Sequence, residues 1–164
     1  MAVIDILRWT AGTGWIVLSG GADAGGEIRS LALRRAKAQG GVAYLGFNEA
    51  SADDVLDDME DLGAPTGYLV NVVSEDDDTI QAQLMDASII VIDDSVSPDE
   101  WRSSLIGAAI NAMREALERG VVILAEGSGA AALGGYLLSE EGQFLEGLGW
   151  LQNSLILPEV TSLT

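Results

Sequence analysis

The sequence contains no histidine and no cysteine, and Lys37 is its only lysine. Without cysteine the chain has no disulfide, no thiolate nucleophile and no thiolate metal site. Without histidine it lacks the commonest general base and the commonest metal ligand. Hydrolysis by this chain would therefore need another base, and a metal site would need oxygen ligands.

Positive charge is scarce throughout the chain. Lys and Arg total 8 against 26 Asp and Glu, which gives a formal net charge of -18. Nucleic acid is excluded as a partner because binding to phosphates requires basic side chains, and anionic membranes are disfavoured for the same reason. The acidic excess favours a solvated surface or adaptation to a salty cytoplasm, and a cation-binding cleft is the alternative.

Long apolar runs are also missing. No segment approaches the ~20 apolar residues that span a bilayer, and Asp5 and Arg8 interrupt the N-terminal stretch where a secretory signal would have its apolar core. At 164 residues, with 48% hydrophobic and 21% charged residues, the composition is that of one globular domain. We therefore expect a single domain over residues 1–164 and a cytoplasmic location.

Short apolar, β-branched runs alternate with longer amphipathic stretches. This pattern predicts an α/β fold with a doubly wound, mostly parallel sheet in three layers, of the flavodoxin-like kind. The predicted strands are residues 15–18, 42–47, 68–73, 88–92 and 121–125, with a weaker sixth at 155–157.

Four helices are predicted between these strands. They cover residues 27–39, a stretch from Ser51 to the residue before Gly63, residues 75–85, and residues 98–120. In the first helix Arg29 is expected on the polar side, with Arg34, Arg35 and Lys37. The last helix starts at Pro98 after Ser97 as N-cap, and its apolar stripe, which includes Trp101 and Ile106, is expected to pack against the sheet.

Ligands of such sheets bind beyond the carboxyl ends of the strands, so the residues that follow each strand are candidates for a site. Gly20 and Gly21 follow the first strand, where paired glycines allow a tight turn and a close approach to a ligand. Asp93 and Asp94 follow the fourth strand, and Glu126 follows the fifth.

Ser128 stands between two glycines where the fifth strand passes into an alanine-rich helix. A nucleophile elbow requires this arrangement, because only small neighbours let the hydroxyl stand free on a sharp turn. The alternative is that Ser128 only caps the helix that follows, since serine is a preferred N-cap.

The order of these features resembles the peptidase S51 family, which includes the dipeptidase E and cyanophycinase-like enzymes and has a class I glutamine amidotransferase-like fold. The first strand ends in Gly20-Gly21, a long helix closes on Gly120, and a strand then leads into Gly127-Ser128-Gly129-Ala130-Ala131. Gly147-Leu148-Gly149-Trp150-Leu151, followed by Leu155-Ile156-Leu157-Pro158-Glu159, is similar to the C-terminal part of the family pattern.

The resemblance implies that Ser128 is the nucleophile, that the amide of Gly129 helps to form the oxyanion hole, and that Glu159 stands where the family has its catalytic histidine. A carboxylate with an ordinary pKa of about 4 is a poor base for a serine hydroxyl. Asp93 and Asp94 replace a glycine pair of the family's oxyanion region, where two carboxylates would repel a developing oxyanion. The resemblance also implies a domain shortened at its C-terminus relative to the family.

Three functional hypotheses follow. The first is a catalytically inactive S51-like domain that binds a small molecule, a peptide or a protein partner, with no cofactor. The second is a pocket for Mg²⁺ or Ca²⁺ formed by Asp93, Asp94 and Glu126, with Glu159 as a further candidate ligand. The third is a residual serine hydrolase that uses Ser128. We also expect a homodimer.

Overall fold

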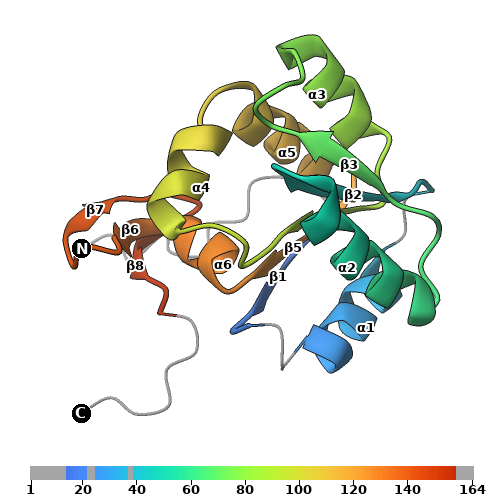
Figure 1. Cartoon of the computed structure of the whole chain (residues 1–164), viewed down its shortest axis with the longest axis horizontal. Helices are drawn as coiled ribbons and strands as arrows, with labels where there is room; N and C mark the ends of the chain where they lie inside the picture. The colour runs from blue at the N-terminus through green and yellow to red at the C-terminus, as the bar shows by residue number, and fades with distance from the viewer. Residues whose placement is uncertain (1–13, 22–24, 37–38, 158–164) are drawn as a thin grey trace.

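The protein is described here by a computed structural model, which defines residues 14–21, 25–36 and 39–157 (Figure 1). Lys37 and Glu159 lie outside these residues.

Two β-sheets form the framework. The large sheet has five strands, β1 (Trp15–Ser19), β2 (Val42–Gly46), β3 (Tyr68–Asn71), β4 (Ile89–Ile92) and β5 (Val122–Glu126). All five predicted strands are confirmed, with ends displaced by no more than two residues. Every pairing in this sheet is parallel, and the strand order is β1-β5-β4-β2-β3.

Helices cover both faces of the large sheet and complete three layers, so the predicted doubly wound α/β fold is confirmed (Figure 1). One face carries α1 (Gly25–Arg35) and α2 (Glu49–Asp61). The opposite face carries α3 (Asp77–Met85), α4 (Pro98–Leu105), α5 (Ala108–Glu118) and α6 (Ser128–Ala132).

The central strands are apolar along their whole length because both of their faces are buried. In β4, Ile89 and Val91 pack with α1 and α2, whereas Ile90 and Ile92 pack with the helices of the other face. Successive side chains of a strand point to opposite faces, so a continuous apolar run supplies both halves of the core.

The predicted long helix over residues 98–120 is wrong, because the chain forms two helices there. Ile106 has an extended conformation (φ -61°, ψ 129°), and Gly107 has φ 109°, a value that favours glycine. The break turns Ile106 away from the core, and this residue is 57% exposed. Trp101 is fully buried, as predicted.

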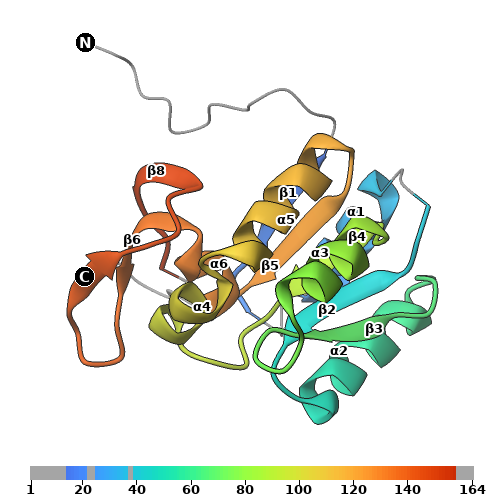
Figure 2. The same ribbon diagram turned by 90° about the horizontal axis from the view of Figure 1, so that it is seen from above.

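A second, smaller sheet lies beside α4 and α6 at one end of the large sheet (Figure 2). It contains β6 (Gly134–Leu138), β7 (Phe144–Glu146) and β8 (Leu151–Leu155), in the order β7-β6-β8. This sheet was not predicted from the sequence, and the weak sixth strand predicted at residues 155–157 overlaps only the end of β8. Three short strands with glycine-rich turns have little apolar periodicity, which explains the miss.

Within the residues that the structure defines, no helix has both the length and the apolar character needed to cross a membrane.

Candidate functional site

A pocket of about 420 Å³ opens at the carboxyl ends of β4 and β5, beside α1 and α2. Its lining residues are Arg29, Ser51, Asp54, Val55, Asp93, Asp94, Ser95 and Glu126. The structure thus brings together the three carboxylates that the sequence placed after the fourth and fifth strands. Adjacent parallel strands end at the same edge of a sheet, so the residues that follow them become neighbours.

Asp93 is buried and fully engaged by hydrogen bonds. The Tyr44 hydroxyl donates to its Oδ2 over 2.7 Å, and the Ser95 amide donates to its Oδ1 over 3.0 Å. Its main-chain oxygen accepts from Trp101 Nε1 at 2.9 Å and from the amide of Gly129 at 3.1 Å. Asp93 therefore holds β2, α4 and α6 together at the base of the pocket.

Burial raises the pKa of the Tyr44 phenol well above its ordinary value of about 10, and the negative charge of Asp93 acts in the same direction. Tyr44 therefore stays protonated at neutral pH and donates its hydrogen bond to Asp93. A Cβ on Gly46 would collide with the Tyr44 ring, so glycine at position 46 leaves the ring the space it occupies.

Glu126, the last residue of β5, is paired with a buried arginine. Arg29 Nε and Nη2 each donate to one carboxylate oxygen of Glu126 over 2.7 Å, and Nη1 donates to Asp58 Oδ2 over 2.6 Å. The hydrogen bonds to Glu126 raise the pKa of Arg29 further, so the guanidinium remains charged. The expectation that Arg29 lies on a polar helix face is wrong, since only 8% of the residue is exposed.

Gly127, in the turn from β5 to α6, has an unusual backbone conformation, with φ 55° and ψ -119°. A Cβ at this position would collide with the carboxyl group of Asp94 and lie 2.7 Å from the Asp94 Cβ. Both the backbone and the space therefore require glycine.

Asp94 fills the space beside Gly127 and also binds the start of α6. Its Oδ1 accepts a hydrogen bond of 2.8 Å from the amide of Ser128. The Ser128 amide, the first backbone donor after Gly127, is thus already bound by a carboxylate of the same chain.

Ser128 and Gly129 are both committed to internal contacts. The Ser128 hydroxyl donates to the main-chain oxygen of Val96, and the Gly129 amide donates to Asp93. A Cβ on Gly129 would lie 2.7 Å from the carbonyl oxygen of Ile92, so this glycine allows α6 to approach the end of β4.

The predicted metal ligands lie around one pocket without forming a metal-binding group. In the part of the chain that the structure describes, no set of three or more Asp, Glu, His or Cys residues could hold a metal ion. All three predicted ligands already have partners, since Glu126 binds Arg29, Asp93 binds Tyr44 and Asp94 binds the amide of Ser128.

The three other predicted residues lie either apart from the pocket lining or outside the described residues. Gly20 and Gly21 follow β1, whose last residue, Ser19, is the register partner of Glu126. The Ser19 hydroxyl donates to the main-chain oxygen of Gly21 over 3.1 Å, which stabilises this turn. Neither glycine lines the pocket. Glu159 lies outside the described residues.

The fold is similar to that of a solved peptidase. A crystal structure of a peptidase from an acI-B1 Actinobacterium matches with a TM-score of 0.68 at 17% sequence identity, over 90% of this chain and 70% of that one. No family model matches the sequence. The search of curated proteins found no match either. The comparison with the peptidase supports the fold, and the chemistry has to be judged from the residues of this chain.

Three residues that shape the site were not predicted from the sequence. Arg29 gave no signal because its helix carries several arginines, and Tyr44 sits inside an apolar run that predicts only a strand. Gly127 was noted only as a small neighbour of Ser128. Its backbone conformation and its contact with Asp94 depend on the tertiary structure.

Proposed function

We propose that this chain is a non-hydrolysing domain on a peptidase S51-like scaffold, with a binding role. The observation that supports the proposal best is the position of Asp94, which fills the space of a side chain at Gly127 and accepts the hydrogen bond of the following amide.

In a nucleophile elbow the strained residue of the strand-to-helix turn carries the nucleophile. In this chain that residue is Gly127, which has no side chain. If Gly127 is aligned with the serine of the family's Gly-Thr-Ser-Ala-Gly-Ala pattern, Gly129 and Ala130 fall on the pattern's last Gly-Ala. Ser128 then lies one residue beyond the nucleophile position. This alignment replaces the one-to-one match of Ser128 with the family nucleophile.

The oxyanion hole of an elbow uses the amide of the residue after the nucleophile. That amide is Ser128 N, and Asp94 Oδ1 binds it at 2.8 Å. A carboxylate oxygen thus stands where the oxygen of a tetrahedral intermediate would have to bind. An intermediate formed here would have to displace Asp94 and would meet its negative charge.

The remaining requirements of serine hydrolysis also lack support. The Ser128 hydroxyl is directed to the main chain at Val96, and the chain contains no histidine to accept its proton. Hydrolysis by Ser128 therefore has neither a base nor a free oxyanion donor among the residues that line the turn.

Reaction with a fluorophosphonate probe, followed by intact mass measurement, tests this proposal. We expect no adduct on the wild-type chain at a probe concentration that fully labels a known serine hydrolase. The matched variant is Ser128→Ala, which should likewise show only its own unmodified mass after treatment with the probe. An adduct on the wild type that Ser128→Ala loses would overturn the proposal in favour of a residual hydrolase.

A further inference from the structure

The small sheet exposes an apolar face that nothing in the described residues covers. Cross-strand partners lie on the same face of a sheet, and β6 pairs Leu138 with Phe144 and Tyr136 with Leu155. All four of these side chains are substantially exposed, with Phe144 at 69% and Tyr136 at 50%. We call the surface formed by Tyr136, Leu138, Phe144 and Leu155 the apolar face.

The opposite side of the same sheet is occupied along β6, whereas Leu145 of the edge strand β7 is 38% exposed on that side. Leu137 alternates with Tyr136 and Leu138 along β6 and is completely buried, and β6 contacts both α4 and α6. Leu148 and Trp150, which flank the turn into β8, pack against the main core. Along β6, one side of the sheet therefore belongs to the core of this chain, whereas the apolar face has no such partner among residues 14–21, 25–36 and 39–157.

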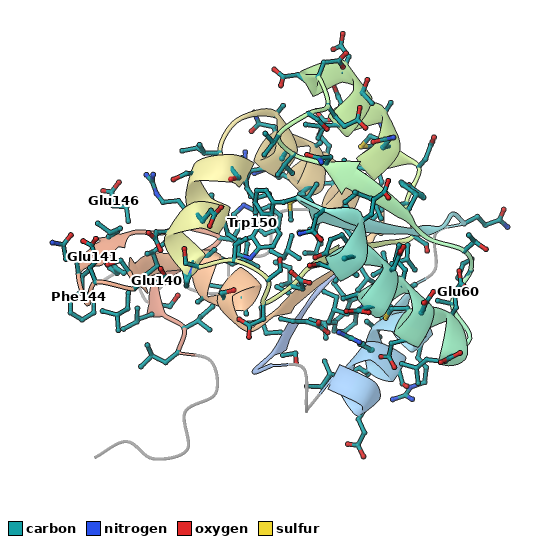
Figure 3. The ribbon with its side chains drawn as sticks, viewed as in Figure 1. Glu60, Glu140, Glu141, Phe144, Glu146 and Trp150 are labelled. Carbon is teal, nitrogen blue, oxygen red and sulfur yellow. The ribbon has the colours of Figure 1, made fainter. Side chains whose placement is uncertain are left out.

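Three glutamates lie on the apolar face or at its edge. Glu146 is the register partner of Tyr136, and Glu140 and Glu141 lie in the turn between β6 and β7. Figure 3 shows Glu140, Glu141, Phe144 and Glu146 together at one end of the molecule, with Glu60 at the opposite end. Residues 133–157 contain no lysine or arginine, so these charges have no compensating cation within the segment.

We propose that the apolar face binds a basic protein or peptide that presents apolar side chains between lysines or arginines. Exposed aromatic and aliphatic residues within a charged rim are the composition of a protein interface. The rim is acidic, so a cationic partner has complementary charge, which favours both association rate and specificity.

Charge disfavours a second copy of the chain on this surface. A two-fold contact through the apolar face would bring two sets of the same three glutamates together, between molecules that each carry a net charge of -18. This proposal gives the binding role proposed above a surface and a partner class. It does not depend on the state of Ser128, because no residue of the apolar face belongs to the Gly127 turn.

The test uses the full chain and a synthetic amphipathic peptide of leucine and lysine, titrated by isothermal calorimetry at about 0.15 M salt, where exposed long-range charge effects are screened. We expect binding, and we expect Phe144→Ser to weaken it about tenfold or more, because Phe144 is the most exposed side chain of the apolar face and aromatic side chains dominate such contacts. A matched control is Val73→Ser, an exposed apolar residue on a distant loop, which should leave the affinity unchanged.

A second pair of variants separates specific contact from general attraction to an acidic protein. The triple variant Glu140→Gln, Glu141→Gln, Glu146→Gln should weaken binding, whereas Glu49→Gln, Glu60→Gln, Glu118→Gln removes the same charge elsewhere and should not. No binding, equal loss in both triple variants, or no effect of Phe144→Ser would each overturn the proposal. So would a wild-type dimer in sedimentation that Phe144→Ser dissociates, since the occupant would then be a second copy.

Discussion

Gly127 and Asp94 depend on one another although they belong to different loops. Glycine is required at position 127 by φ 55° and by the Asp94 side chain, and Asp94 in turn fills the space that a side chain at 127 would use. The backbone conformation and the Asp94 side chain thus both exclude a side chain at position 127. An elbow with a nucleophile at this position would therefore require changes at both residues.

We predict that Gly127→Ala lowers the free energy of unfolding by about 3 kcal/mol. Roughly half of this comes from the strained backbone and the rest from overlap with Asp94. In a double-mutant cycle, Asp94→Gly should relieve the overlap, so the two substitutions together should cost at least about 1 kcal/mol less than their sum. Urea unfolding of the four proteins measures these values.

Gly142→Ala is the matched control for this cycle. Gly142 also has a positive φ, 79°, but a Cβ there would meet nothing within 4 Å. Its cost should be about 1 kcal/mol from the backbone alone and should not change with Asp94→Gly. Strict additivity between Gly127→Ala and Asp94→Gly would contradict the contact on which the proposed function rests.

Tyr44 is expected to make stability sensitive to alkaline pH. The pKa of Tyr44 in the folded state is raised above the value of about 10 that the phenol has in the unfolded chain. Between the unfolded and the folded pKa, the unfolded phenol loses its proton while the folded one keeps it. This contribution to the free energy of unfolding is complete below pH 10 and falls as pH rises above 10. Tyr68, whose pKa burial also raises, contributes in the same direction.

Tyr44→Phe should reduce this alkaline loss, and the part due to Tyr68 should remain. At pH 7 the same substitution should cost about 1.5–3 kcal/mol, because Asp93 loses one hydrogen bond to its charged carboxylate. Chemical unfolding measured from pH 7 to pH 11 gives both effects. An alkaline slope identical to that of the wild type would contradict the role assigned to Tyr44.

Among the elements, α4 and α5 show that a break between two helices can leave the apolar pattern of a single helix unchanged. Apolar positions recur at helical spacing from Trp101 to Leu117, which predicts one helix. Gly107 interrupts it with φ 109°, and the two helices then take different directions over the sheet (Figure 1). Periodicity reports which residues are apolar but does not detect a change in helix axis.

We predict that Gly107→Ala destabilises the protein by about 1 kcal/mol. A Cβ at 107 would meet nothing within 4 Å, so the cost comes only from the positive φ. In one continuous helix the same change would stabilise by about 1 kcal/mol, because alanine is a better helix former than glycine. The sign of the change in urea unfolding therefore distinguishes the two structures. Asn111→Ala, exposed within α5, should stabilise slightly and serves as the control.

At the scale of the whole molecule, the net charge of -18 should make stability depend on salt. Added NaCl screens the repulsion among carboxylates, so we predict a melting temperature that rises with ionic strength. MgCl₂ and CaCl₂ at the same ionic strength should give the same rise. A larger rise with either cation at millimolar concentration would instead support a specific Mg²⁺ or Ca²⁺ site in the pocket.

Most of the large sheet was predictable because its strands are buried on both faces and read as continuous apolar runs. The residues that follow β4 and β5 could also be assigned to one site, since parallel strands end at one edge. The small sheet was not predictable, because its strands are short and half exposed. The exposure of Arg29 was predicted wrongly because a charged residue on a helix is usually exposed, and its burial becomes favourable only through its partners Glu126 and Asp58.

The sequence by itself determined the α/β class, the acidic surface and the absence of histidine and cysteine chemistry, because these follow from composition and local periodicity. Only the tertiary structure decided that Gly127, rather than Ser128, takes the strained position of the turn. It also decided that Asp94 accepts the hydrogen bond of the Ser128 amide. Asp94 and Ser128 are 34 residues apart in the chain. Contacts at that separation depend on how the strands are ordered in the sheet, and no local pattern of residues encodes them.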